Sequence, residues 1–180
     1  MRPIACSFAC LLLIAAGPCY AAAKDCSNDA IAAKPLGGSV QGKPFAAKSI
    51  HIDFTKDGMR IDGAAFDRYV LHLESNGIFN EFNIDMLVPS GKKPDGRTFR
   101  VLPVDSIGAQ PSVVQGVPEV QGWELELDDQ GVDASFTQDT AAIRVELGQR
   151  KGAALAGKIH VCVPSQNAEI EGSFTATMAP

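Results

Sequence analysis

Apolar side chains alternate with polar ones along most of the chain. In each such run the apolar residues lie two positions apart, which is the pattern of a β-strand with one buried face. The expected buried faces are Ile50, Ile52 and Phe54; Tyr69, Leu71 and Leu73; Phe82, Ile84 and Met86; Trp123, Leu125 and Leu127; Ile143, Val145 and Leu147; Ile159, Val161 and Val163; and Ile170, Phe174, Ala176 and Met178. The chain is therefore predicted to be rich in strands, with Trp123 in the core.

Turn-forming residues separate these runs. Asn-Gly and Asp-Gly pairs supply the positive φ that tight hairpins need. Turns are predicted at residues 56–58, 62–63, 76–77, 90–91, 95–96, 121–122 and 129–131. The best helix candidate, residues 27–34, is ended by Pro35 after two turns at most. The predicted fold is all-β, an antiparallel β-sandwich, with a closed or partly open β-barrel as the alternative.

Residues 1–23 have the plan of a secretory signal peptide. Arg2 precedes a short apolar stretch, Pro18 ends that stretch, and three alanines stand before Lys24. We therefore expect cleavage after Ala23, a single domain over residues 24–180, and a periplasmic or secreted location with no transmembrane segment after cleavage. A lipoprotein is disfavoured because proline precedes Cys19. The lack of an Asn-x-Ser/Thr site favours a bacterial periplasm.

Cleavage would leave Cys26 and Cys162 of the five cysteines. A pair of cysteines in an oxidising compartment predicts one disulfide. The alternative is a reactive or metal-binding thiol pair. It lacks Cys-x-x-Cys spacing and has only His160 close to Cys162 in the sequence.

Composition and charge narrow the classes of function. With 46% hydrophobic and 21% charged residues, the chain is typical of a globular protein. Removal of Arg2 would change the net charge from −5 to −6. Because no basic run or patch is present, nucleic-acid binding is not expected.

The three histidines, His51, His72 and His160, are the candidate metal ligands. All fall on polar faces of predicted strands and could hold zinc or copper if those strands were neighbours. Sequence does not show adjacency, so no metal site and no cofactor are predicted. Residues 128–133 place acidic side chains around a glycine but lack the closing glutamate of a calcium loop, so a hairpin tip is expected there.

No motif for nucleophilic or phosphate chemistry is present. Residues 37–41 miss the last glycine of the G-x-S-x-G elbow. Glu124 and Glu126 lie two positions apart on one strand face, which favours a solvated face over an acid/base pair. Enzymatic activity is therefore not expected, and a hydrolase would need one of the histidines to share a cleft with carboxylates.

Prolines recur between residues 88 and 120. Prolines at this spacing are incompatible with central strands and predict edge strands and long surface loops. The segment is interpreted either as a solvated connection or as a recognition loop on a rigid scaffold.

Two terminal segments carry a resemblance. Residues 38–45 (GSVQGKPF) and 170–176 (IEGSFTA) resemble the opening and closing strands of uncharacterised bacterial exported β proteins. The resemblance implies an exported all-β domain and transfers no catalytic residue. The signal-type segment, the alternating pattern, the predicted disulfide and the lack of a catalytic motif lead to the hypothesis of a monomeric binding module for a small ligand or a protein partner in the cell envelope. The alternative is an inhibitor or immunity-type protein that binds a partner enzyme.

Overall fold

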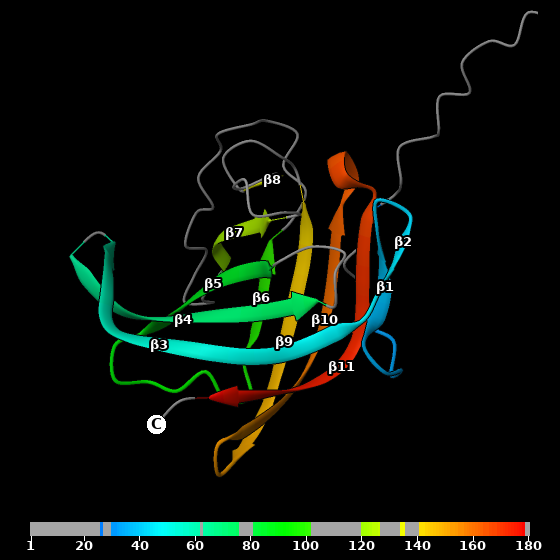
Figure 1. Cartoon of the computed structure of the whole chain (residues 1–180). Helices are drawn as coiled ribbons and strands as arrows, with labels where there is room; N and C mark the ends of the chain where they lie inside the picture. Colours follow the sequence, from blue (N-terminus) through cyan, green and yellow to red (C-terminus); the bar gives the residue numbers. More distant parts are fainter. Residues whose placement is uncertain are drawn as a thin grey trace, which may run out of the picture.

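The computed structural model describes residues 26, 30–61, 63–75, 81–101, 120–126, 134–135 and 141–178. They form an eleven-stranded sheet that is strongly curled and open (Figure 1). The elements are β1 (Gly37–Val40), β2 (Lys43–Phe45), β3 (Ala47–Ile61), β4 (Ala64–Ser75), β5 (Glu81–Pro89), β6 (Thr98–Val101), β7 (Val120–Glu126), β8 (Ala134–Ser135), β9 (Ala142–Lys151), β10 (Ala154–Val163), the 3₁₀ turn η1 (Pro164–Gln166) and β11 (Ala168–Met178). The predicted all-β class is confirmed.

The strand order is β6-β9-β10-β11-β3-β4-β5-β7-β8, with β1 beside β11 and β2 beside β1. The sheet curls so far that β3 and β4 cross in front of β9 (Figure 1). β6 and β7 belong to opposite halves of the order, yet some of their Cα atoms lie within 8 Å of each other. Curling lets the two halves of the sheet bury their apolar faces against one hydrophobic core. Within the described ranges of the chain, no helix is both long and apolar enough to cross a membrane.

One strand pair departs from the predicted antiparallel arrangement. β11 and β3 pair in parallel, with Thr177 opposite His51 and Met178 opposite Ile52. Every other named strand pair is antiparallel. The prediction was wrong at this pair because it assumed hairpin neighbours. β3 and β11 are far apart in the sequence, so no tight turn dictates their direction.

The predicted buried faces make up most of the core. Trp123 is 2% exposed and packs near Phe82, with 6.1 Å between the ring centroids. Phe54 contradicts the prediction, since it is 45% exposed. It lies on β3 opposite Tyr69, and the two rings pack with centroids 5.0 Å apart. Leu127 lies outside the described residues.

Glycine turns are confirmed where the chain reverses between strands. Gly63, Gly91 and Gly96 lie in turns with positive φ. The turns predicted at residues 56–58 and 121–122 are wrong, because both segments lie within strands, at irregularities in the pairing. The turns at 76–77 and 129–131 fall outside the described residues. Residues 30–34 are not helical, which corrects the helix candidate there.

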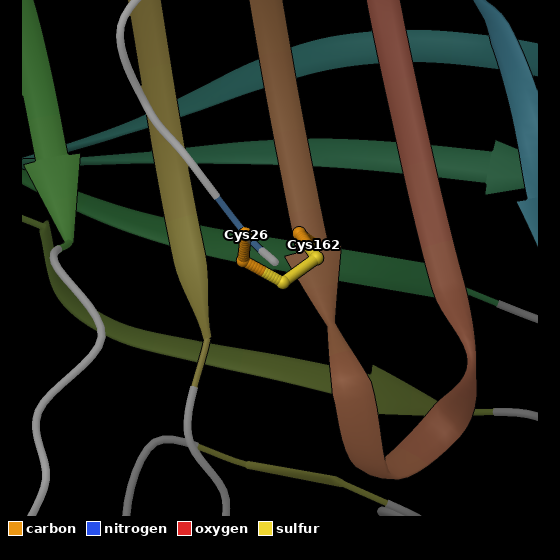
Figure 2. Close-up of a disulfide and its surroundings, with 2 residues drawn as sticks. All are labelled: Cys26 and Cys162. Carbon is orange, nitrogen blue, oxygen red and sulfur yellow. A yellow bond between two sulfur atoms is a disulfide. The ribbon is translucent and has the colours of Figure 1, made fainter. Parts of the chain in front are cut away.

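A disulfide joins Cys26 to Cys162 at the end of β10, with 5.8 Å between the Cα atoms (Figure 2). This confirms the predicted pairing across a sequence separation of 136. Farther along the same N-terminal segment, the Ser173 N–H donates to the Lys34 carbonyl at 2.8 Å and the Leu36 N–H donates to the Ser173 carbonyl at 3.1 Å. The segment is therefore held to β10 and β11 by one covalent bond and a short ladder.

We expect Gly172→Ala to lower the free energy of unfolding by about 2–3 kcal/mol. Gly172 has φ +139°, and a Cβ there would lie 2.6 Å from the Pro35 carbonyl oxygen. Gly152→Ala is the matched control, since Gly152 also has positive φ (+63°) but faces open space. Urea unfolding of both variants separates the destabilisation caused by the clash from that caused by the positive φ, which the two positions share. Equal losses would show that the N-terminal segment does not pack closely on Gly172.

Candidate functional site

A bulge in β3 sets the register of the candidate site. Beyond the bulge Met59 lies opposite Phe66, and before it Thr55 lies opposite Arg68. If the first register continued, His51 would face Glu74. The bulge shifts the pairing by two residues, and His51 instead lies opposite His72. A bulge is a common device for re-aiming a side chain in this way.

The two histidines form the centre of the site on the polar face of the sheet. Their rings are stacked, with centroids 4.4 Å apart and an interplanar angle of 6°. Glu81 on β5 joins them. One donor atom from each of His51, His72 and Glu81 lies within 4.8 Å of the other two. Imidazole nitrogens and carboxylate oxygens are ligands for zinc and other divalent transition metals.

His72 lies between two carboxylates. Its Nδ1 is 2.5 Å from Glu81 Oε1, and its Nε2 is 3.6 Å from Asp53 Oδ2. The Asn83 side-chain amide donates to Glu81 Oε2 at 3.2 Å. His72 is 17% exposed, whereas Asp53 is 61% exposed. The imidazole is thus held in place on the Glu81 side and faces a more accessible carboxylate on the other.

Neighbouring charges on this face are mostly paired. Arg68 donates to both carboxylate oxygens of Asp85, at 2.9 and 2.8 Å. Glu74 accepts a hydrogen bond from Ser49, and this bond, with the nearby positive charge of Lys48, lowers the pKa of Glu74 despite some desolvation. Asp53 and Glu81 instead contact His72, and among the described residues neither forms an ion pair with a lysine or arginine.

His160 lies apart from the other two histidines. It is on β10, 8% exposed, with Arg144 on β9 and Glu171 on β11 opposite it in the ladders. Lys34 lies 2.6 Å from Glu171. The hydrogen bond from Lys34, together with the Ala32 N–H and the nearby His160, lowers the pKa of Glu171. The structure therefore brings together His51 and His72 and places His160 in a separate polar cluster under the N-terminal segment.

Other candidate features lie elsewhere. A groove of about 510 Å³ is lined by residues of β9, β10 and β11, and none of them belongs to the histidine cluster. Within the proline-rich segment, β6 is an edge strand as expected, while residues 102–119 lie outside the described residues. The acidic residues 128–133 also lie outside them.

Sequence reasoning missed Asp53 and Glu81. Asp53 shares the polar face of β3 with His51, and the period-two pattern could have placed it there. Glu81 begins β5, where Glu74 rather than His72 is its partner in the ladder. Its side chain reaches diagonally to His72, and such diagonal contacts depend on the rotamer as well as on the register.

Comparisons of the chain with protein families, with curated proteins and with solved structures find no match. The assignment of function therefore depends on the geometry of the site.

Proposed function

We propose that the protein is an exported binding module that holds a divalent transition-metal ion at His51 and His72, with a carboxylate completing the protein ligands. The observation that carries this proposal is the meeting of the stacked His51 and His72 rings with two carboxylates on three adjacent strands. Donor atoms of His51, His72 and Glu81 lie within 4.8 Å of one another, and Asp53 Oδ2 lies 3.6 Å from His72 Nε2. Strands are rigid supports, so only side-chain rotation is needed to bring the donors closer.

The ligand types favour a metal ion of intermediate hardness, such as zinc, over the hard ions magnesium and calcium. Two imidazoles and a carboxylate match catalytic-type zinc sites, which keep a position open to solvent. Magnesium and calcium prefer oxygen ligands throughout. Zinc, copper(II) and nickel(II) are accordingly the ions to test first.

Export is the second part of the proposal. It is supported by the signal-type segment at residues 1–23 and by the Cys26–Cys162 disulfide, a bond that persists in oxidising compartments. In this proposal residues 24–180 are a single periplasmic or secreted domain, a sandwich formed by the two halves of the curled sheet.

We expect the mature protein, purified without a histidine tag, to bind one zinc ion per chain. Isothermal titration calorimetry measures the affinity, and native mass spectrometry measures the stoichiometry. His72→Ala removes the central ligand, so it should weaken zinc binding by more than the roughly 10–100-fold typical of losing a residue that only supports a ligand. His51→Ala should also weaken it.

Thr177→Ala is the matched control, because Thr177 is exposed and lies beside His51 in the β3–β11 pair. Its zinc affinity should equal that of the unchanged protein. The proposal is wrong if zinc, copper(II) and nickel(II) all fail to bind, or if His51→Ala and His72→Ala bind them as tightly as Thr177→Ala does.

A further inference from the structure

We infer that the metal ion binds on the Nε2 side of His72, with Asp53 and His51 as the other protein ligands, and that Glu81 is a positioning residue. This inference rests on the proposed function and assigns a role to each atom of the site.

The two distances at His72 distinguish the two carboxylates. Two ligand atoms that share a tetrahedral zinc ion at about 2.0–2.1 Å lie about 3.4 Å from each other. The separation of 3.6 Å between His72 Nε2 and Asp53 Oδ2 is close to this span. The separation of 2.5 Å between Nδ1 and Glu81 Oε1 is too short for an ion between them and is that of a strong hydrogen bond.

Both oxygens of Glu81 are already engaged. Oε1 accepts from His72 Nδ1, and Oε2 accepts from the Asn83 amide. A carboxylate acceptor at Nδ1 favours the tautomer with the ring proton on that nitrogen, and this tautomer has its lone pair on Nε2. Metal-binding histidines commonly have such a carboxylate partner on the nitrogen opposite the metal.

His72 Nε2 is buried and has no hydrogen-bond partner among the described residues. A buried polar atom without a partner is costly, by roughly 1–3 kcal/mol. A metal ion on Nε2 would remove that cost. Asp53, 61% exposed, is able to rotate toward the ion and leaves the remaining coordination position open to water.

The ring protons of His72 test this assignment. Long-range ¹H–¹⁵N spectra of the zinc-loaded, histidine-labelled protein show which nitrogen of each ring carries a proton. We expect the His72 proton on Nδ1 and zinc on Nε2. A proton on Nε2 with zinc on Nδ1 would overturn the inference and leave the proposed function standing, whereas failure to bind any of the three ions would overturn both.

Variants test the two carboxylates separately. Asp53→Asn removes a ligand and should weaken zinc binding more than Glu81→Gln, for which a loss of about 10–100-fold is expected. Glu124→Gln removes the same charge one strand beyond Asn83 and should leave the affinity unchanged. Equal affinity of Asp53→Asn and the unchanged protein, or a greater loss for Glu81→Gln than for Asp53→Asn, would overturn the assignment.

Discussion

Reduction of the Cys26–Cys162 disulfide is expected to lower the free energy of unfolding by about 4–5 kcal/mol. The bond spans a sequence separation of 136, so its loss restores a large amount of conformational entropy to the unfolded chain. For a domain of this size, a loss of that magnitude lowers the melting temperature by roughly 10–20 °C. We expect this loss of stability to exceed that of the Gly172→Ala substitution.

Calorimetry of a protein that comprises residues 24–180, with and without dithiothreitol, measures this effect. The double variant Cys26→Ala and Cys162→Ala should melt close to the reduced protein and should not respond to the reductant. Two thiols that titrate freely in the native, oxidised protein would contradict the expectation, as would a melting temperature that does not change on reduction.

Replacement of Asp67 by alanine is expected to cost about 3–5 kcal/mol of folding stability. Asp67 is 3% exposed and joins three segments of chain. Its Oδ1 accepts from the Asp57 N–H at 3.0 Å and from the Ser90 hydroxyl at 2.7 Å, and its Oδ2 accepts from the Gly91 N–H at 2.9 Å. Alanine would leave the Asp57 and Gly91 N–H groups without this acceptor, and the Ser90 hydroxyl would keep only Asp57 Oδ1.

The same network makes stability depend on pH. Burial by itself raises the pKa of Asp67, but the hydrogen bonds from Asp57, Ser90 and Gly91, with the nearby Lys56, outweigh it and lower the pKa below the ordinary value of 3.8. Because the folded state favours the ionised carboxylate, this contribution is fully present above about pH 4. It is lost as the pH falls through the lowered, folded-state pKa.

Urea unfolding at pH 7 and pH 3 tests both statements about Asp67. The unchanged protein should have a lower free energy of unfolding at pH 3 than at pH 7. The isosteric variant Asp67→Asn should be less stable than the unchanged protein at pH 7, and its free energy of unfolding should fall less on going to pH 3. A parallel loss in the two proteins would show that Asp67 does not titrate as argued. Since the Asp57 N–H lies in the bulge of β3, both Asp67 variants should also weaken zinc binding.

Alternation of apolar and polar residues was enough to predict the strands and most of the core. Tyr69, Leu71 and Leu73 are all buried as their spacing indicated. Phe54 obeys the same period but is 45% exposed, because periodicity assigns a side chain to a face and does not show how much of that face other strands cover. The cysteine pair was predictable because the expected removal of residues 1–23 leaves only Cys26 and Cys162 of the five cysteines.

The candidate site was predictable only in its residue types. His51 and His72 were identified as possible ligands, but their adjacency depends on the bulge at residues 56–58, which the sequence suggested was a turn. Lys-Asp-Gly favours positive φ in either setting, and Asp57 indeed has φ 52°. The choice between a turn and a bulge is made by tertiary contacts, among them the hydrogen bond from Asp57 to Asp67.

The parallel pairing of β3 with β11 has a consequence for the order of folding. β3 pairs on one side with β4, the next strand along the chain, and on the other side with the C-terminal part of β11. Local hairpins such as β3–β4 and β9–β10 can form within microseconds. The β3–β11 contact has a high contact order and must wait for a long loop to close, which places this fold among the slow, millisecond-to-second class. A chain cut before β11 would present unpaired edges on both β3 and β10, and such edges promote aggregation.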